Sequence, residues 1–193
     1  VELGQQFEPP LSKSAVNHRM RRLMEIVREL EAEEAEAVCG DVAAYLDFAN
    51  HVPLEKLAFL KSALDMNRRV YRTAVEKGMD RQVLPSMMLK DPSVFVQAKR
   101  MAGAASYARM SGVPLPVMTA TGSGNQGLTL FLTVDAAAQA FGADEEKLLR
   151  ALALANMVNI YIKSHIGPLS SVCACGVASG LGASLGAVYL LGG

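Results

Sequence analysis

The sequence has 193 residues, of which 51% are hydrophobic and 20% are charged, with 16 Gly and 8 Pro. A chain of this length and composition can bury a core, and it is unlike a disordered or a fibrous protein. Its 19 basic residues balance its 19 acidic ones, so no global positive field attracts nucleic acid. We therefore expect a globular domain that does not bind nucleic acid.

The three cysteines are Cys39, Cys173 and Cys175. An odd number, with two of them only one residue apart, is a poor disulfide framework but suits soft-metal binding in a reducing compartment. No basic and then apolar leader opens the chain, so we expect a cytoplasmic location. The chain opens with Val1 rather than Met, which leads us to expect a fragment of a longer protein.

The first forty residues divide into two parts. Residues 1–13 contain Pro9-Pro10 and no periodicity, which is typical of a lead-in or linker. From residue 14 apolar residues recur at steps of three and four, which predicts an amphipathic helix that ends near Gly40. The apolar positions are Val16, Met20, Leu23, Val27 and Leu30. We therefore expect one helical domain over residues 14–193.

Three more helices are predicted from their boundaries. One opens at Pro53 and ends before Gly78, and a second is capped at Asp91-Pro92 and runs to Ser111. A third opens on the acidic residues 144–146 and runs toward Gly167-Pro168. Between them, residues 128–134 have the composition of a short buried strand, and periodicity alone does not decide whether they form a strand or a helix.

No charged residue follows Lys163, and the remaining 30 residues are long enough for a membrane span. Glycines at Gly176, Gly180, Gly182 and Gly186 would also allow two membrane helices to pack closely. The tail is richer in Gly, Ala, Ser and Cys than in large apolar residues, which favours a buried helix instead. We predict an all-α, multi-helix domain around a central Gly/Ala-rich buried helix, with a membrane protein as the alternative.

A glycine-rich segment is the first candidate site. Its residues are Thr121, Gly122, Ser123, Gly124, Asn125, Gln126 and Gly127. Bare backbone amides and short polar side chains can bind an anion, but the same glycines also suit a tight turn that binds nothing. The spacing matches neither a dinucleotide fingerprint nor a phosphate loop. The residues alone leave anion binding and a plain turn equally open.

The second candidate site is the pair Cys173 and Cys175, which opens the small-residue helix. Amides at a helix N-terminus lower thiol pKa values, so both could bind iron or zinc as thiolates. Free cysteines also pack as small hydrophobic residues, and this alternative stays open. We expect Cys39 to be inert, and His18, His51 and His165 to be surface or packing residues because they lack ligand spacing.

Several segments taken together resemble one protein family. They are Ala108-Arg109-Met110, residues 114–118, the run from Gly122 to Gly127, Ile162-Lys163-Ser164 and Cys173-Ala174-Cys175. This combination resembles the UPF0597 family, which is similar to L-cysteine desulfidases and more remotely to the alpha chain of iron-sulfur L-serine dehydratases. The resemblance is dense over residues 104–193, thinner over 54–103 and weak before that.

The resemblance implies an all-helical lyase with a [4Fe-4S] cluster held by three cysteines. Such an enzyme would eliminate the β-substituent of L-cysteine or L-serine, giving pyruvate and ammonia, and also sulfide from cysteine. It implies that Cys173 or Cys175 is a cluster ligand, without deciding which. It also implies that the loop from Gly122 to Gln126, together with Lys163, binds the amino-acid substrate.

The chain departs from the family pattern in ways that bear on activity. The family's Gly-Cys-Thr-Glu-Pro and Cys-Asp-Gly-Ala-Lys motifs are missing, Tyr107 replaces a typical Asp and His165 replaces a typical Tyr. We therefore expect this chain alone to lack the cluster and to be inactive, with a homo-oligomer as a possible assembly. The alternative is a non-enzymatic helical module that binds a small carboxylate. The lyase hypothesis requires the two cysteines and the glycine-rich segment to share one pocket.

Overall fold

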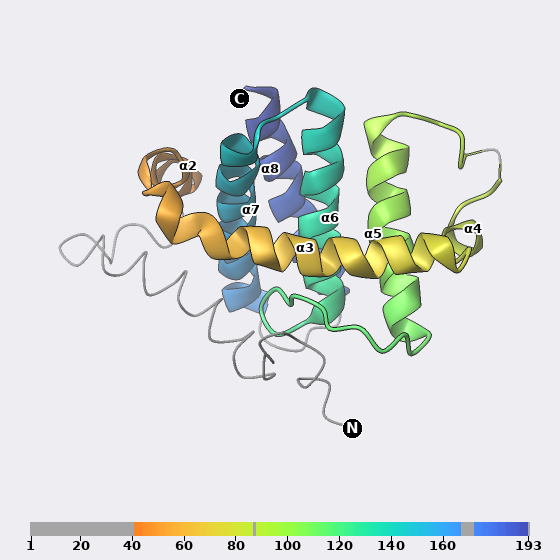
Figure 1. The fold of residues 1–193 in the computed structure, drawn as a ribbon. Coiled ribbons are helices and arrows are strands. Elements are labelled where there is room, and N and C mark those ends of the chain that lie inside the picture. Colours follow the sequence, from red (N-terminus) through yellow and green to blue (C-terminus); the bar gives the residue numbers. More distant parts are fainter. Residues whose placement is uncertain (1–40, 87, 167–171, 193) are drawn as a thin grey trace.

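A computed structural model describes residues 41–86, 88–166 and 172–192 as an assembly of helices (Figure 1). Its elements are α2 (Val42–His51), α3 (Leu54–Glu76), α4 (Asp80–Val83), α5 (Val94–Met110), α6 (Gly124–Phe141), α7 (Glu145–Ile166), the π-helical segment η2 (Cys175–Gly180) and α8 (Leu181–Leu191). No strand occurs in these ranges, which confirms the all-α prediction. The predicted lead-in, the predicted helix over residues 14–40 and Cys39 lie outside the described residues.

The predicted boundaries of α3 and α7 are confirmed. Helix α3 begins directly after Pro53 and ends two residues before Gly78. Helix α7 begins after Asp144, whose carboxylate accepts a hydrogen bond from the Lys147 N–H at 2.8 Å. The start of α7 therefore follows ordinary capping chemistry, whereas Pro53 precedes α3 without a side-chain cap.

The start of α5 differs from the prediction by two residues. Ser93 caps the helix, because its Oγ accepts a hydrogen bond from the Val96 N–H. The carboxylate of Asp91 instead accepts the Ser93 N–H at 2.8 Å, within a turn that precedes the helix. Asp91 and Pro92 therefore prepare the entry to α5 rather than form its first turn.

Residues 128–134 are helical and lie at the centre of the molecule, within α6. One face of α6, with Leu128 and Leu132, packs in a cluster with α3 and α5. Another face, with Phe131 and Val134, packs in a cluster with α7 and α8. Because α6 is buried on both sides, its sequence is apolar in a nearly continuous run, and this is why it resembled a strand.

Helix α3 crosses in front of α5, α6 and α7, which stand side by side with α8 behind them (Figure 1). A buried ion pair fixes this crossing. The Arg68 guanidinium of α3 donates to both carboxylate oxygens of Asp135 in α6, at 2.9 and 2.6 Å, and Asp135 is fully buried. This bidentate pair satisfies a carboxylate inside the core.

The small-residue tail packs closely against α6 and α7, as its glycines predicted. A Cβ at Gly182 would overlap the carbonyl oxygen of Ala155, and one at Gly186 would lie 2.9 Å from Val134 Cγ2. The opposite face of the tail, with Leu181 and Val188, is exposed. Helix α6 therefore lies deeper in the core than α8 does.

Among the described residues, none of the helices has the length and apolar character that crossing a bilayer requires.

Candidate functional site

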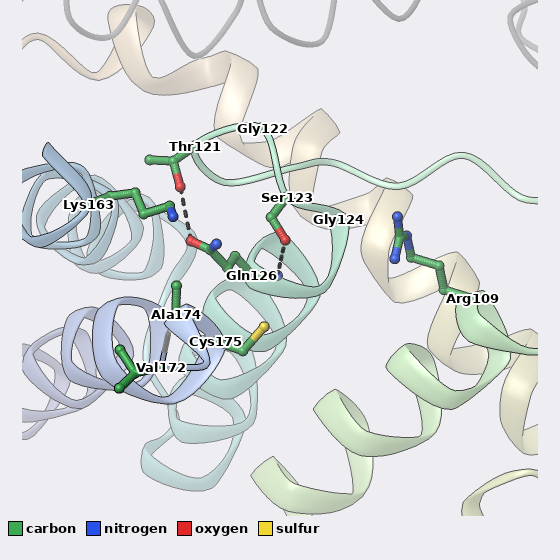
Figure 2. Close-up of a pocket in the computed structure, with 10 residues that line it drawn as sticks. All are labelled: Arg109, Thr121, Gly122, Ser123, Gly124, Gln126, Lys163, Val172, Ala174 and Cys175. Atoms are coloured by element: carbon green, nitrogen blue, oxygen red, sulfur yellow. Dashed lines mark hydrogen bonds between the residues drawn. The ribbon is translucent and has the colours of Figure 1, made fainter. Parts of the chain in front are cut away.

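The two predicted sites meet in one pocket of about 590 Å³, which we call the loop pocket. Its lining residues are Arg109, Thr121, Gly122, Ser123, Gly124, Gln126, Lys163, Val172, Ala174 and Cys175. Figure 2 shows Lys163, Thr121 and Gln126 on one side, Arg109 on the other, and the Cys175 sulfur between them. Of the two cysteines, Cys175 lines this pocket and Cys173 does not, so one of the two sulfurs shares a cavity with the glycine-rich segment.

The glycine-rich segment is a tight turn that leads directly into α6. The backbones of Ala120 and Ser123 hydrogen-bond to each other across the turn, at 3.1 and 3.0 Å. Thr121 (φ 47°) and Gly122 (φ 84°) both have left-handed backbone conformations, which only glycine adopts without strain. Ser123 caps α6 by accepting the Gln126 N–H. The segment is thus a turn whose next residues present helix N-terminal amides to the pocket.

Two glycines at the start of α6 allow close approaches. A Cβ at Gly124 would lie 2.5 Å from Arg109 Nε and 2.9 Å from Val117 Cγ2, so only glycine leaves room for the guanidinium there. A Cβ at Gly127 would overlap the carbonyl oxygen of Met118. Gly124 thus lets Arg109 lie against the start of α6 at the pocket, and Gly127 lets α6 pack closely against the backbone of Met118.

Asn125 belongs to the site indirectly. It is not a lining residue; its Oδ1 accepts a hydrogen bond from Arg109 Nη1 at 3.1 Å. This contact holds the guanidinium of an otherwise exposed arginine beside the start of α6. Asn125 therefore orients a cation instead of facing the cavity.

Two polar side chains that line the pocket are buried. Gln126 is 5% exposed and Lys163 is 8% exposed. Gln126 Oε1 accepts a hydrogen bond from Thr121 Oγ1 at 3.0 Å, and no described residue accepts a hydrogen bond from Gln126 Nε2. Arg109 and Lys163 are the charged lining residues, and no Asp or Glu of the described chain lines the cavity. The pocket therefore offers mainly hydrogen-bond donors and positive charge, which suits a small anion.

The two cysteines differ in position and in acidity. Cys173 is exposed, and the Cys175 N–H, the Cys175 thiol and the Gly176 N–H donate hydrogen bonds that lower the pKa of its thiol. Cys175 lines the pocket and is half-buried; burial raises the pKa of its thiol, and the neighbouring Cys173 raises it further. The prediction that both thiols become more acidic is confirmed for Cys173 and wrong for Cys175, because desolvation outweighs the helix amides there.

Comparison with known proteins shows which family this chain belongs to. A family model described as "Serine dehydratase alpha chain" matches residues 18–193. The chain belongs to this family. The resemblance described from the sequence is thereby confirmed.

Curated relatives of this serine dehydratase alpha chain family member are UPF0597 proteins. One from Clostridium tetani is 39% identical over 147 residues, which make up 76% of this chain and 35% of that protein. One from Caldanaerobacter subterraneus subsp. tengcongensis is 38% identical over 151 residues, 77% of this chain and 35% of that protein. One from Desulfotalea psychrophila is 34% identical over 187 residues, 93% and 40% respectively. The chain thus spans little more than a third of these relatives' length. No solved structure matches it.

The two described thiols of this family member are Cys173 and Cys175. A [4Fe-4S] cluster is held by cysteine thiolates, commonly four, and the two neighbouring sulfurs have suitable chemistry. No group of three or more His, Cys, Asp or Glu side chains suited to a metal occurs within residues 41–86, 88–166 and 172–192. The described residues therefore contain no complete ligand set for such a cluster.

Two points remain to be compared with the sequence predictions: the positions of the histidines and the lining residues that were not predicted. His51 and His165 are exposed and line no pocket, as expected; His165 packs against the ring of Tyr161. Thr121, the first residue of the glycine-rich segment, lines the loop pocket, whereas the sequence analysis missed Arg109 as a lining residue. Arg109 lay in a segment that carried the family resemblance, which was the available signal, whereas nothing in the sequence indicated its contact with the start of α6.

Proposed function

We propose that the loop pocket binds the carboxylate of a small amino acid, and that the whole protein is a lyase that performs β-elimination on L-serine or L-cysteine. The single observation that carries the proposal is the pocket itself. Donor groups from the turn, Arg109 and Lys163 lie around a cavity that contains a cysteine sulfur and no carboxylate of the described chain. Membership of the serine dehydratase alpha chain family supports the reaction class.

Each polar group has a defined part in binding under this proposal. The Lys163 ammonium and the Gln126 Nε2 group would bind the substrate carboxylate on the buried side of the pocket, where a charged hydrogen bond is strongest. Arg109, held by Asn125, would add positive charge from the opposite side. This arrangement places the rest of a bound amino acid toward the half-buried Cys175.

The chemistry is a β-elimination. A base removes the Cα proton, the bond from Cβ to oxygen or sulfur breaks with its electron pair on the leaving group, and a Cα–Cβ double bond forms. The resulting 2-aminoacrylate tautomerises to an imine, from which water releases pyruvate and ammonia. Cys173 and Cys175 would supply part of the ligand set of a [4Fe-4S] cluster in the full-length protein. When bound, the cluster would supply a Lewis acid for the leaving group.

The test uses the protein expressed from its complete reading frame and reconstituted anaerobically with iron and sulfide. We expect a brown protein that forms pyruvate from L-serine or L-cysteine. A double Cys173→Ser, Cys175→Ser variant should lose turnover but still bind L-alanine, which has the carboxylate and no leaving group. A colourless and inactive product with every cysteine present would contradict the lyase proposal.

A binding module without catalysis is the second candidate. It is favoured by the fact that the donor groups of the pocket do not depend on the cysteines for their positions. For this candidate, L-alanine would stabilise the protein against thermal unfolding and no reconstitution would produce turnover. Arg109→Ala should remove that stabilisation in either case, and so identify the pocket.

A further inference from the structure

A chain of buried polar side chains runs behind the loop pocket. It begins at Ser179 in η2, passes through Asn159 in α7 and Thr121 in the turn, and ends at Gln126 in α6. Ser179 and Asn159 are fully buried, and Asn156, on the same helix, takes no part in it. Neither Ser179 nor Asn159 lines the cavity, so neither would contact a bound ligand directly.

Each hydrogen bond of this polar series is donated in the same direction, from Ser179 toward Gln126. Ser179 Oγ donates to Asn159 Oδ1 at 2.9 Å, so the amide of Asn159 presents its Nδ2 group on the other side. Asn159 Nδ2 donates to Thr121 Oγ1 at 3.5 Å, the longest link. Thr121 Oγ1 therefore directs its own proton to Gln126 Oε1, at 3.0 Å. Gln126 is left with its Nε2 group as the part of the amide that has no described partner.

The positive charge of the pocket favours the same orientation. In Figure 2 the Lys163 side chain points toward the hydrogen bond between Thr121 and Gln126. An amide oxygen is attracted to an ammonium group and an amide NH₂ is repelled by it. The cation therefore also favours Gln126 Oε1 on the Thr121 side and Nε2 on the other.

We propose that Asn159 and Ser179 are positioning residues that fix the Gln126 amide with its NH₂ group toward the pocket. The pocket can then offer donors to both carboxylate oxygens, whereas the opposite amide orientation would place an oxygen against the anion. This inference rests on the proposed function, since it assigns a purpose to the donor of the carboxylate site. It also gives a role to the π-helical segment, which places Ser179 one turn beyond Cys175 and so links the sulfur side of the pocket to its carboxylate side.

The first test measures the affinity of the full 193-residue chain for L-alanine by calorimetry. Asn159→Leu removes the link without adding charge, so the Gln126 amide can adopt both orientations, and we expect affinity to fall about three- to tenfold. Asn156→Leu is the matched control. Asn156 is as buried as Asn159 and lies on the same helix, but it does not belong to this series of hydrogen bonds. We expect it to leave the affinity unchanged.

The second test reverses the direction of the hydrogen bonds between residue 159, Thr121 and Gln126, and it needs no ligand. In Asn159→Asp, the carboxylate accepts hydrogen bonds from both Ser179 and Thr121, so Thr121 can only accept from Gln126. The Gln126 NH₂ group should then turn to Thr121, and its hydrogen exchange, followed by NMR, should slow at least tenfold relative to the unmodified chain. Asn156→Asp should leave this exchange unchanged. If Asn159→Asp does not fold, Ser179→Ala should instead lower L-alanine affinity two- to threefold while Ser184→Ala does not.

The outcomes separate the two proposals. Equal affinities in Asn159→Leu and Asn156→Leu, with measurable binding to the unmodified chain, would overturn the positioning role and leave the carboxylate site standing. If the unmodified chain does not bind L-alanine, the carboxylate site fails in this chain. The exchange measurement then still decides the amide orientation, and an unchanged Gln126 rate in Asn159→Asp would overturn it.

Discussion

The loop pocket and a second cavity, beside α4, are lined by comparable numbers of cations but differ in how those cations are compensated. The second cavity, which we call the α4 pocket, has a volume of about 410 Å³ and is lined by Val75, Asp80, Arg81, Ser86, Leu89, Lys90 and Arg100. Arg100 Nε and Nη2 both donate to Asp80 Oδ2, at 2.9 and 2.6 Å, and Asp80 is 3% exposed. The α4 pocket thus contains its own anion, whereas no described carboxylate lines the loop pocket.

This difference shows that a cluster of basic residues does not by itself make an anion site. In the α4 pocket the most buried cation is neutralised by a structural ion pair, and the exposed Arg81 and Lys90 remain in contact with solvent. In the loop pocket the described lining holds no carboxylate, and the amide and hydroxyl groups of Gln126, Thr121 and Ser123 lie there with the buried Lys163. Compensation and burial together, and not the count of cations, distinguish the two cavities.

The largest expected effect comes from the backbone of the loop pocket. Gly127→Ala should lower the free energy of unfolding by about 3 kcal/mol or more, because the new Cβ would overlap the Met118 carbonyl oxygen and the backbone would have to move. Urea denaturation measures this loss. The matched control is Gly103→Ala beside α4, where the new Cβ would meet Val83 Cγ2 at an ordinary 3.5 Å. That variant should be neutral or up to about 1 kcal/mol more stable.

The next effect tests compensation in the α4 pocket. Asp80→Asn leaves the partly buried Arg100 without its counter-charge, and we expect a loss of about 2 kcal/mol in the free energy of unfolding. Asp65→Asn, which weakens an exposed ion pair with Arg68, should cost less than about 0.5 kcal/mol. Phosphate should also stabilise Asp80→Asn more than the unmodified chain. Equal stabilisation of both would show that the Asp80 carboxylate does not prevent an anion from binding in the α4 pocket.

A smaller effect is expected when the charge of a lysine in the loop pocket is removed and compared with the same change in the α4 pocket. Lys163→Met keeps the length of the side chain and removes its charge, so affinity for L-alanine should fall about tenfold in calorimetry. Lys90→Met makes the same change at the edge of the α4 pocket, and should leave L-alanine binding unaltered. Similar losses in both variants would mean that general charge, and not the buried position of Lys163, attracts the ligand.

The sequence was sufficient for most of the fold because its signals were local. Pro53 and the acidic residues after position 143 mark helix starts that depend on nearby hydrogen bonds, and both were found. The helix over 128–134 could not be distinguished from a strand, because α6 is buried on two faces and periodicity vanishes when a helix has no solvent side. The placement of Ser93 as the α5 cap depended on a choice between two polar residues, Asp91 and Ser93, on either side of Pro92.

The site was predictable in its parts but not in its assembly. The glycine-rich run and the cysteine pair were identifiable because their composition is unusual, and Lys163 because of the family resemblance. Arg109 reaches the pocket only through packing between α5 and α6, and Asn159 joins the turn from a helix 38 residues further along the chain. Such long-range contacts leave no mark in the local pattern.

The smallest expected effect concerns the two thiols, whose acidity the sequence treated as equal. We expect the rate of iodoacetamide alkylation of Cys173 to rise at a lower pH than for an ordinary thiol, since its folded pKa is lowered and the thiolate forms earlier. The rate for Cys175 should rise at a higher pH than for an ordinary thiol, since burial raises its pKa. Fragment-ion mass spectrometry across a pH series, which locates the label on Cys173 or on Cys175 within their shared peptide, gives the two midpoints.

The cause of the difference can be tested with the same assay. Cys175→Ala removes the thiol that donates to Cys173 and leaves the backbone donors of residues 175 and 176 in place, so the Cys173 midpoint should rise without reaching that of a free thiol. Ser184→Ala, a matched loss of one side-chain donor on α8, should leave it unchanged. A Cys173 midpoint that stays fixed in Cys175→Ala would assign its acidity to the backbone amides alone. The Cys175 thiol would then have no influence on the pKa of the Cys173 thiol.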